Sequence, residues 1–347
     1  MAVVKADAYG HGAVPVAKAL AACGVDWFGV ATVEEALELR QAGIEQPILL
    51  LGGLYMSDPA HLVEYRLTPS VSSTARLDTY AECARRSGCA IEFHLKVDTG
   101  MGRLGVPLDR LGAFLEHYRE LEGLRMTGFF THLASAEDLV ATQTDEQLGC
   151  FGCAIEETRL LGFAPEWIHV SNSAALLSGR AFGPENLVRV GALLYGYCLP
   201  IHAHPGRGPR EVPEFEPILT FKSRVVYLKD VPSGTPLGYG AAFHTRRPSR
   251  IATVPVGYAD GLSRALSNRG RAIVRGHSAH IVGNISMDLT LVDATDIPGV
   301  EVGDEVVLLG KSDDCSITAL EIAREIGTVP YEVLCAIGKR VPRIYVD

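Results

Sequence analysis

The chain has 347 residues, of which 47% are hydrophobic and 21% are charged, and its formal net charge is −9. This length allows one large barrel-sized domain and a smaller one, and the composition is ordinary for a soluble enzyme. The negative charge argues against nucleic acid or an acidic membrane surface as a partner, so small-molecule chemistry is the expected activity.

The first predicted element is an apolar strand that ends on Lys5 and is followed by a turn, residues 6–12, that carries Tyr9 and two glycines. A lysine at the carboxyl end of a buried strand is partly desolvated, which favours the neutral, nucleophilic amine that a Schiff base requires. For this segment taken alone, an ordinary strand-end lysine is the alternative.

The part of the chain over 1–205 alternates short apolar runs with longer amphipathic stretches, which is typical of βα units and a parallel sheet. The expected strands are 2–5, 27–31, 47–52, 68–71, 91–98, 126–133, 168–172 and 187–191. Helical patterns lie between them, such as 33–42, which Gly43 would end, and 108–121. This succession predicts a closed (βα)8 TIM-type barrel, and a doubly wound sheet is the alternative.

In such a barrel the reactive groups lie where strands end and loops begin. Residues at or near these predicted ends are Lys5, Lys96, His132, Asn172 and Arg189. We therefore expect these side chains, although distant in sequence, to meet at one mouth of the barrel.

The stretch 201–209 breaks all periodicity and is interpreted as an interdomain linker, its two histidines lying in a solvated loop. Beyond it, short or alternating apolar runs separated by glycine turns predict a smaller, mostly antiparallel β domain over 212–347. The expected strands are 219–228, 249–255, 271–274, 280–285 and 305–309.

No apolar run approaches the roughly 20 residues that a membrane-spanning helix needs, and we expect neither a signal peptide nor an anchor. The eight cysteines show no disulfide framework, which favours reduced thiols and a cytoplasmic location. Cys150 and Cys153 have redox or metal spacing, but they lie in a helical pattern without a second pair and are interpreted as ordinary helix residues.

Ten short sequence blocks spread along nearly the whole chain share one further property. They are 1–12, 94–105, Thr131-His132, 171–175, 188–191, Gly238-Tyr239-Gly240, 257–261, Ser286-Met287-Asp288, 331–333 and 340–343. In this order they resemble the alanine racemases, and residues 1–12 resemble the pyridoxal-phosphate signature of that family.

The resemblance implies an isomerase that interconverts L-alanine and D-alanine through a pyridoxal-phosphate aldimine, with the cofactor as electron sink. Lys5 would hold the cofactor aldehyde and act as the base on one face of the substrate. Tyr239, contributed by the partner subunit of a homodimer with shared active sites, would act on the other face. The D-alanine formed would supply peptidoglycan in a bacterial cytoplasm.

The resemblance also implies how the cofactor is bound. Arg189 would face the pyridine nitrogen and, being always protonated, would keep that nitrogen unprotonated. His132 and Arg189 could perturb the pKa of Tyr239, which is ordinarily about 10. The phosphate would be held by the hydroxyls of Tyr9, Tyr331 and Ser173 and by the amides of Gly191 and Ala192. Ser173 also opens a helical pattern, so an N-cap role is the alternative, and the two roles can coexist.

For the substrate, the resemblance assigns the carboxylate to Arg103, oriented by Lys96, a lysine that is commonly carbamylated in the family. Tyr258 and Met287 of the partner subunit would crowd the substrate side chain and so favour alanine. The corridor to the site is assigned to Glu137, Arg264 and Asn284. Asn284 stands where the family often has arginine, which could broaden the selectivity.

Alanine racemases typically carry a segment ahead of the lysine strand, and because that strand begins here at Met1, we expect the N-terminal segment to be truncated. The alternatives in function are a broader serine or lysine racemase, a decarboxylase of the same two-domain architecture, and a noncatalytic pyridoxal-phosphate carrier. A barrel metalloenzyme would need more ligands than His94 and His132, so no metal is expected.

Overall fold

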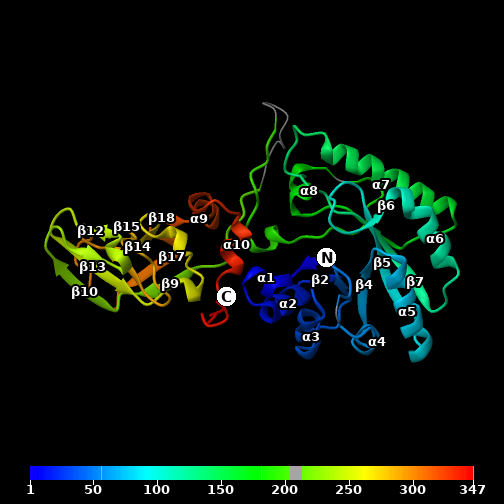
Figure 1. Cartoon of the computed structure of the whole chain (residues 1–347), viewed down its shortest axis with the longest axis horizontal. Coiled ribbons are helices and arrows are strands. Elements are labelled where there is room, and N and C mark those ends of the chain that lie inside the picture. The colour runs from blue at the N-terminus through cyan, green and yellow to red at the C-terminus, as the bar shows by residue number, and fades with distance from the viewer. Residues whose placement is uncertain (56, 181, 204–212, 347) are drawn as a thin grey trace. The chain divides into compact units, whose positions relative to one another are not determined.

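The computed structural model describes residues 1–55, 57–180, 182–203 and 213–346. They form two compact units, and Figure 1 draws the chain coloured by residue number. The first unit comprises Met1–Ala8 and Gly12–Phe215, and the second comprises Tyr9–His11 and Glu216–Asp347. Most of the predicted linker, and the predicted domain limits at 205 and 212, lie outside the described residues.

The first unit is a barrel of parallel strands. The strands are β1 (Ala2–Val3), β2 (Phe28–Val30), β3 (Ile48–Leu50), β4 (Leu67–Val71), β5 (Ile91–Asp98), β6 (Val106–Pro107), β7 (Leu124–Phe130) and β8 (Trp167–His169). They pair in the order β1-β2-β3-β4-β5-β7-β8, with β6 beside β5. The predicted strand 187–191 closes the ring, because Arg189 N donates to Ser171 O at 2.9 Å and Val190 forms a parallel bridge with Ala2. The predicted barrel is confirmed, with most strands shorter than expected.

Helices follow these strands, and Figure 1 shows α3, α5, α6 and α7 outside them. The helices are α1 (Lys5–Tyr9), α2 (Ala13–Ala22), α3 (Val33–Gln41), α4 (Ala60–Glu64), α5 (Thr74–Ser87), α6 (Leu111–Arg119), α7 (Gln143–Leu160) and α8 (Ser173–Ser178), with 3₁₀ turns η1 (Leu108–Arg110) and η2 (Ala192–Tyr195). Helix α3 begins with a capping box at Thr32, and Gly43 follows its end with φ 86°, as the sequence predicts.

Parallel strands are covered on both faces, which explains their nearly continuous apolar sequences. One buried cluster joins Met1, Trp27, Leu49 and Leu187, against which Trp167 packs. The buried polar side chains of the barrel, including His94, Lys96, His169 and Arg189, are therefore exceptions that call for a functional account.

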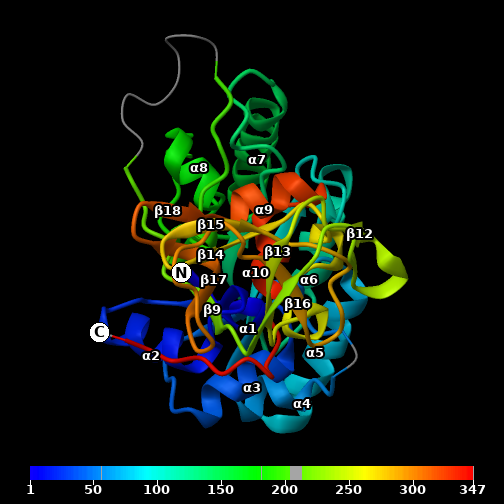
Figure 2. The same cartoon turned by 90° about the vertical axis from the view of Figure 1, so that its left-hand side faces the viewer.

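The second unit is mostly antiparallel. Its strands are β9 (Phe221–Arg224), β10 (Tyr227–Val231), β11 (Pro236–Leu237), β12 (Phe243–His244), β13 (Ser249–Val254), β14 (Arg271–Val274), β15 (His277–His280), β16 (Thr290–Asp293), β17 (Glu305–Ser312) and β18 (Cys315–Ile317). One sheet has the order β10-β13-β16, β11 pairs with β12, and β15-β14-β17-β18 form a further sheet with β9 beside β17. Figure 2 shows β14, β15 and β17 side by side. The helices are α9 (Ala319–Ile326) and α10 (Pro330–Cys335), with turns η3 (Tyr239–Ala241), η4 (Tyr258–Asp260) and η5 (Arg264–Leu266).

Two predicted strands of this unit were wrong in detail. The run 219–228 contains two strands of different sheets, because Val225 N bonds to Asp304 O while Val226 N bonds to Thr253 O. The strand predicted at 280–285 is instead β15, which ends at His280. Gly283, at φ 76°, leaves the extended conformation that a longer strand would need.

Helix α7 contains Cys150 and Cys153, as predicted, and all eight cysteines are free thiols. Within the described part of the chain, no helix combines the length and the apolar character needed to cross a membrane. In the same residues, no group of three or more His, Cys, Asp or Glu side chains is arranged to hold a metal ion.

Candidate active site

Lys5 begins a backbone turn that the sequence does not predict. Residues 6–9 have φ values between 53° and 55°, so all four lie in the left-handed region although none is glycine. This region costs about 1–2 kcal/mol for each residue that carries a Cβ. Strain of this kind persists where surrounding contacts hold it, and such places are often functional sites.

The predicted barrel-mouth residues of the first unit come together. Lys96 Nζ lies 5.5 Å from the ring centre of Phe130, and the Arg189 guanidinium lies 5.3 Å from the same ring. His132 Nδ1 is 3.2 Å from Arg189 Nη2. Lys96, His132 and Arg189 therefore form one cluster. Lys5 follows β1, which lies beside the strand that carries Arg189 through the bridge between Ala2 and Val190.

The cluster is strongly electropositive, and burial disfavours additional charge in it. Burial, followed by the charge of Arg189, lowers the pKa of His132 to about 2, so this imidazole is neutral. Burial, followed by Arg189 and Arg103, lowers the pKa of Lys96 to about 8. Burial lowers the pKa of Arg189 to about 10, which still leaves the guanidinium charged at neutral pH.

Arg189 is held by a buried network. Its Nη2 donates to Thr131 O at 2.8 Å and to Val170 O at 2.9 Å. Its Nη1 lies 2.9 Å from His169 Nδ1, and His169 Nε2 lies 2.9 Å from His94 Nδ1. Because a guanidinium only donates, His169 Nδ1 accepts and Nε2 carries the proton. His169 is missed by sequence reasoning, since nothing but its place near a strand end distinguishes it.

Ser173 lies beside the predicted phosphate amides. Gly191 N donates to Ser173 Oγ at 2.9 Å. The N-cap of α8 is Asn172, whose side chain accepts from Ala175 N at 3.0 Å, so the N-cap alternative for Ser173 was wrong. The Ser173 hydroxyl and the backbone amides at the start of η2, at Ala192, therefore form a polar site suited to an anion.

Tyr9 and Tyr331, the other predicted phosphate contacts, lie together in the second unit. Their ring centres are 5.9 Å apart with an interplanar angle of 83°. Burial, followed by the neighbouring Tyr331, raises the pKa of Tyr9 to about 12. Tyr9 is therefore a neutral hydroxyl, able to donate to an anion.

The loop that carries Arg103 is shaped by Asp98 and glycines. Asp98 Oδ1 accepts from Gly100 N at 3.0 Å and from Gly102 N at 3.1 Å. A Cβ on Gly105 would lie 2.4 Å from Asp98 N, so only glycine fits this close approach. Arg103 itself is exposed on this loop.

A buried glutamine that the sequence does not single out supports the loop after β7. Gln147 Nε2 donates to His132 O at 3.0 Å, and Gln147 Oε1 accepts from Ala134 N at 2.9 Å. Gln147 Nε2 also donates to Thr99 Oγ1 at 3.3 Å, next to the Arg103 loop. Glu137 lies in the same loop after β7.

Tyr239 of the second unit lies in η3, and 73% of its surface is exposed. Asn284 Nδ2 donates to Tyr239 O at 2.9 Å. Asn268 Nδ2 donates to Ala242 O at 3.1 Å, and Asn268 Oδ1 accepts from Gly283 N at 2.7 Å. Two asparagines therefore hold the loop that carries the exposed Tyr239 ring. Asn284, which the sequence predicts to line the corridor, contacts the backbone of Tyr239.

Tyr258 and Met287 lie on adjacent loops of the second unit and are 44% and 52% exposed. Tyr258 N donates to Ser286 O at 3.1 Å. Arg340 joins these loops, because it forms ion pairs with Asp260 and Asp288, each at 2.7 Å. Large exposed apolar side chains gathered on one surface commonly mark an interaction site.

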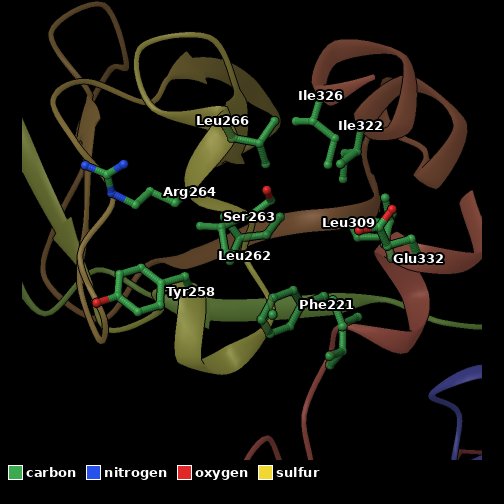
Figure 3. Close-up of a pocket in the computed structure, with 15 residues that line it drawn as sticks. Phe221, Tyr258, Leu262, Ser263, Arg264, Leu266, Leu309, Ile322, Ile326 and Glu332 are labelled. Carbon is green, nitrogen blue, oxygen red and sulfur yellow. The ribbon is translucent and has the colours of Figure 1, made fainter. Parts of the chain in front are cut away.

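A largely apolar cavity of about 290 Å³ lies within the second unit. Figure 3 shows Tyr258 and Arg264 on one side of it and Ile322, Ile326 and Glu332 on the other. Tyr258 and Arg264, two of the predicted site residues, line this cavity, whereas Tyr239 and Met287 do not.

Comparisons with known proteins place both parts of the chain in one family. The model of the alanine racemase N-terminal domain matches residues 1–199, and that of the C-terminal domain matches 218–345. Alanine racemase 2 of Caldanaerobacter subterraneus subsp. tengcongensis is 42% identical over 347 residues, covering 100% of this chain and 88% of that protein.

Solved structures of this family are also similar to the chain. A Bacillus anthracis alanine racemase with bound L-Ala-P has a TM-score of 0.88 and 34% identity, covering 100% of this chain and 88% of that one. A Bartonella henselae alanine racemase with covalently bound pyridoxal phosphate has a TM-score of 0.84 and 31% identity, with coverage of 99% and 92%.

Proposed function

The chain belongs to the alanine racemase family, and from this premise we propose the residues and the cofactor by which it works. It is an isomerase that interconverts L-alanine and D-alanine. The observation that supports the proposed site is the convergence of Lys96, His132 and Arg189 at the carboxyl ends of barrel strands, with Lys5 at the end of the neighbouring strand β1.

Pyridoxal phosphate is the proposed cofactor, as in the similar Bartonella henselae structure. The residues fit this group: Lys5 offers an amine for the aldehyde, and Arg189 offers a charged guanidinium for the ring nitrogen. The phosphate would be held by Ser173 Oγ, the amides of Gly191 and Ala192, and the hydroxyls of Tyr9 and Tyr331. When bound, the cofactor supplies an electron sink for the charge that develops on the substrate α-carbon.

Racemisation requires one group to remove a proton from the α-carbon and another to return a proton from the opposite face. We assign these roles to the Lys5 amine and the Tyr239 hydroxyl. Tyr239 is exposed on a clamped loop, which suits a side chain that completes the site of a partner subunit. His132 and Arg189 would then place a hydrogen-bond donor and a positive charge beside the oxygen of that tyrosine.

Arg189 would limit side reactions of the bound cofactor. Its buried guanidinium keeps its own protons at neutral pH and would leave the ring nitrogen of the cofactor unprotonated. Arg103 would bind the substrate carboxylate. The lowered pKa of Lys96 supports carbamylation, since the neutral amine is the form that reacts with carbon dioxide. The resulting anion would orient Arg103.

We further propose a two-fold homodimer in the bacterial cytoplasm that supplies D-alanine for peptidoglycan, with no nucleic-acid or membrane partner. The exposed side chains of Tyr239, Tyr258 and Met287 support a partner on that surface. Tyr258 and Met287 would limit the space for the substrate side chain, and Glu137, Arg264 and Asn284 would line the corridor. The proposed domains are 1–205 and 212–347.

The test is the absorbance of the purified protein before and after borohydride, combined with an assay of D-alanine formation. We expect an absorbance band of bound cofactor, its loss on reduction, and attachment of the reduced cofactor to Lys5 by peptide mapping. Lys5→Ala should remove the attachment and the activity. Attachment to another lysine would contradict the assignment.

A broader serine or lysine racemase is the second candidate, favoured by Asn284, which contacts the backbone of Tyr239 in place of an arginine in the corridor. Initial rates with L-alanine, L-serine and L-lysine distinguish the two. A decarboxylase would release carbon dioxide in the same assay, and a carrier would show bound cofactor without turnover.

A further inference from the structure

The strained turn after Lys5 raises the question of what holds it. Residues 6–9 all have φ between 53° and 55°, and left-handed backbone is unfavourable for residues that carry a Cβ. Ala8 N donates to Val4 O at 2.9 Å, which closes the turn locally. The direction of the Lys5 side chain depends on how the peptide unit between Lys5 and Ala6 is oriented. The hydrogen-bond partner of the Ala6 amide fixes that orientation.

That partner is a carboxylate. Ala6 N donates to Glu35 Oε1 at 2.7 Å. The second oxygen, Glu35 Oε2, accepts from Ala31 N at 2.7 Å and from Thr32 N at 3.3 Å. Both oxygens of this half-buried side chain therefore receive backbone amides. Hydrogen bonds to an ionised carboxylate are stronger than bonds between neutral groups.

Through these bonds Glu35 links the carboxyl ends of two neighbouring strands. Ala6 comes after β1, and residues 31–32 follow β2. The two strands are parallel partners, with Val3 opposite Gly29. One carboxylate thus ties the turn after Lys5 to the loop of the adjacent βα unit.

This arrangement exceeds what helix capping requires. A capping box needs only one acceptor that reaches back to the N-cap amide. In the capping box of α9, Glu321 Oε2 accepts from Thr318 N at 2.7 Å, while Oε1 pairs with Arg271 at 3.1 Å. In α3 the corresponding second oxygen of Glu35 is directed to Ala6 instead.

We propose that Glu35 is a positioning residue for Lys5, holding the Lys5–Ala6 peptide unit so that the amine meets the cofactor aldehyde. This inference rests on the proposed role of Lys5. Glu35 acts through the backbone and takes no part in proton transfer.

The test compares variants that remove the Ala6 contact with one that disturbs only the helix cap. Glu35→Ala deletes the carboxylate, and Glu35→Met does so while keeping a side chain of similar length that favours helix. Thr32→Ala is the matched control, because it removes the oxygen that accepts from Glu35 N at 3.3 Å and leaves the Glu35–Ala6 bond in place.

Two measurements are made on the full chain. Hydrogen exchange of the Ala6 amide is followed in cofactor-free protein, and borohydride capture of pyridoxal phosphate on Lys5 is titrated against cofactor concentration. Loss of one charge-assisted bond should accelerate Ala6 exchange, and raise the cofactor concentration for half-maximal capture, by about tenfold in both Glu35 variants. Thr32→Ala should leave both quantities at wild-type values while lowering the melting temperature.

Wild-type exchange and capture in the Glu35 variants would overturn the proposal, and so would equal changes in Thr32→Ala. If Glu35→Ala does not fold, Glu35→Met decides by the same criteria. A failure of the proposed function is distinguishable, because cofactor would then be captured on another lysine in the wild-type chain. The Ala6 exchange rates would still report whether Glu35 holds the turn.

Discussion

At the scale of single residues, one electropositive cluster lowers the pKa values of two bases, His132 and Lys96. His132 has its pKa lowered to about 2 and is uncharged at any ordinary pH. Lys96 has its pKa lowered to about 8, so its charge changes near neutrality. Burial is the largest cause for both, and Arg189 is the next. The same environment therefore keeps His132 a neutral imidazole, which accepts from Arg189 at Nδ1, and makes Lys96 a reactive amine.

The first prediction concerns Lys96. Because its neutral fraction grows as the pH rises through about 8, carbamylation in bicarbonate should increase between about pH 7 and about pH 9. Carbon-13 NMR with labelled bicarbonate and mass spectrometry would detect one added carbon dioxide on Lys96. Lys222, an exposed lysine paired with Glu305 at 3.0 Å, is the internal control. Equal labelling of both lysines would exclude a special reactivity of Lys96.

The second prediction concerns acid stability. The folded protein keeps His132 neutral, whereas an unfolded histidine binds a proton below about pH 6.5. The pKa is lowered in the folded state, so the stability present above about pH 6.5 should fall as the pH decreases, by about 1.4 kcal/mol per pH unit for each such histidine. His94 and His169, whose pKa values burial also lowers, should add to this slope.

Denaturant unfolding at several pH values measures the slope directly. His132→Asn should flatten it by about the contribution of one proton. An unchanged slope in His132→Asn would show that His132 does not resist protonation in the folded state.

At the scale of elements, hydrogen bonds and ion pairs of side chains hold the site loops of the second unit in place. The Tyr239 loop is held by Asn284 and Asn268, and the loops of Tyr258 and Met287 are held by Arg340. The exposed side chains that we assign to the partner's site are thus presented on backbone that is already ordered. Ordering before association reduces the entropy lost when the site is assembled.

The third prediction concerns Asn284. Asn284→Ala and Asn284→Arg both remove the bond to Tyr239 O, so both should lower kcat for alanine by about three- to tenfold through misplacement of that ring. Only the arginine variant adds bulk and charge to the corridor, so only it should disfavour lysine relative to alanine. Rates with the two substrates separate these effects, and equal selectivity in both variants would remove the corridor role.

The fourth prediction concerns Arg340. Arg340→Met should loosen the Tyr258 and Met287 loops. The KM for alanine should then rise, and the ratio of kcat/KM for alanine to kcat/KM for serine should fall. The pair with Asp288 is exposed, whereas Asp260 is buried, so loss of Arg340 leaves a buried carboxylate without this partner and should also lower the stability. Arg250→Met is the matched control, since Arg250 pairs with Asp230 at 2.8 Å in the same unit, outside these loops. The same kinetics in both variants would argue against a positioning role for Arg340.

At the scale of the whole molecule, the sequence predicts the barrel and the meeting of Lys5, Lys96, His132 and Arg189, because parallel strand ends converge by geometry. It does not predict the left-handed turn 6–9, since no glycine occupies those four positions to signal it. The double role of Glu35 is hidden for a similar reason, because its local pattern is that of any capping box. The split of 219–228 between two sheets depends on pairing partners that are distant in sequence.

The central claim, that one active site takes a base from each of two subunits, is tested most directly by mixing Lys5→Ala chains with Tyr239→Phe chains. In a two-fold dimer each heterodimer regains one site with both bases, so random reassembly should restore about a quarter of wild-type activity. Subunit exchange is verified separately with differently labelled chains. Activity that stays at the level of the single variants, although the subunits exchange, would contradict the shared site.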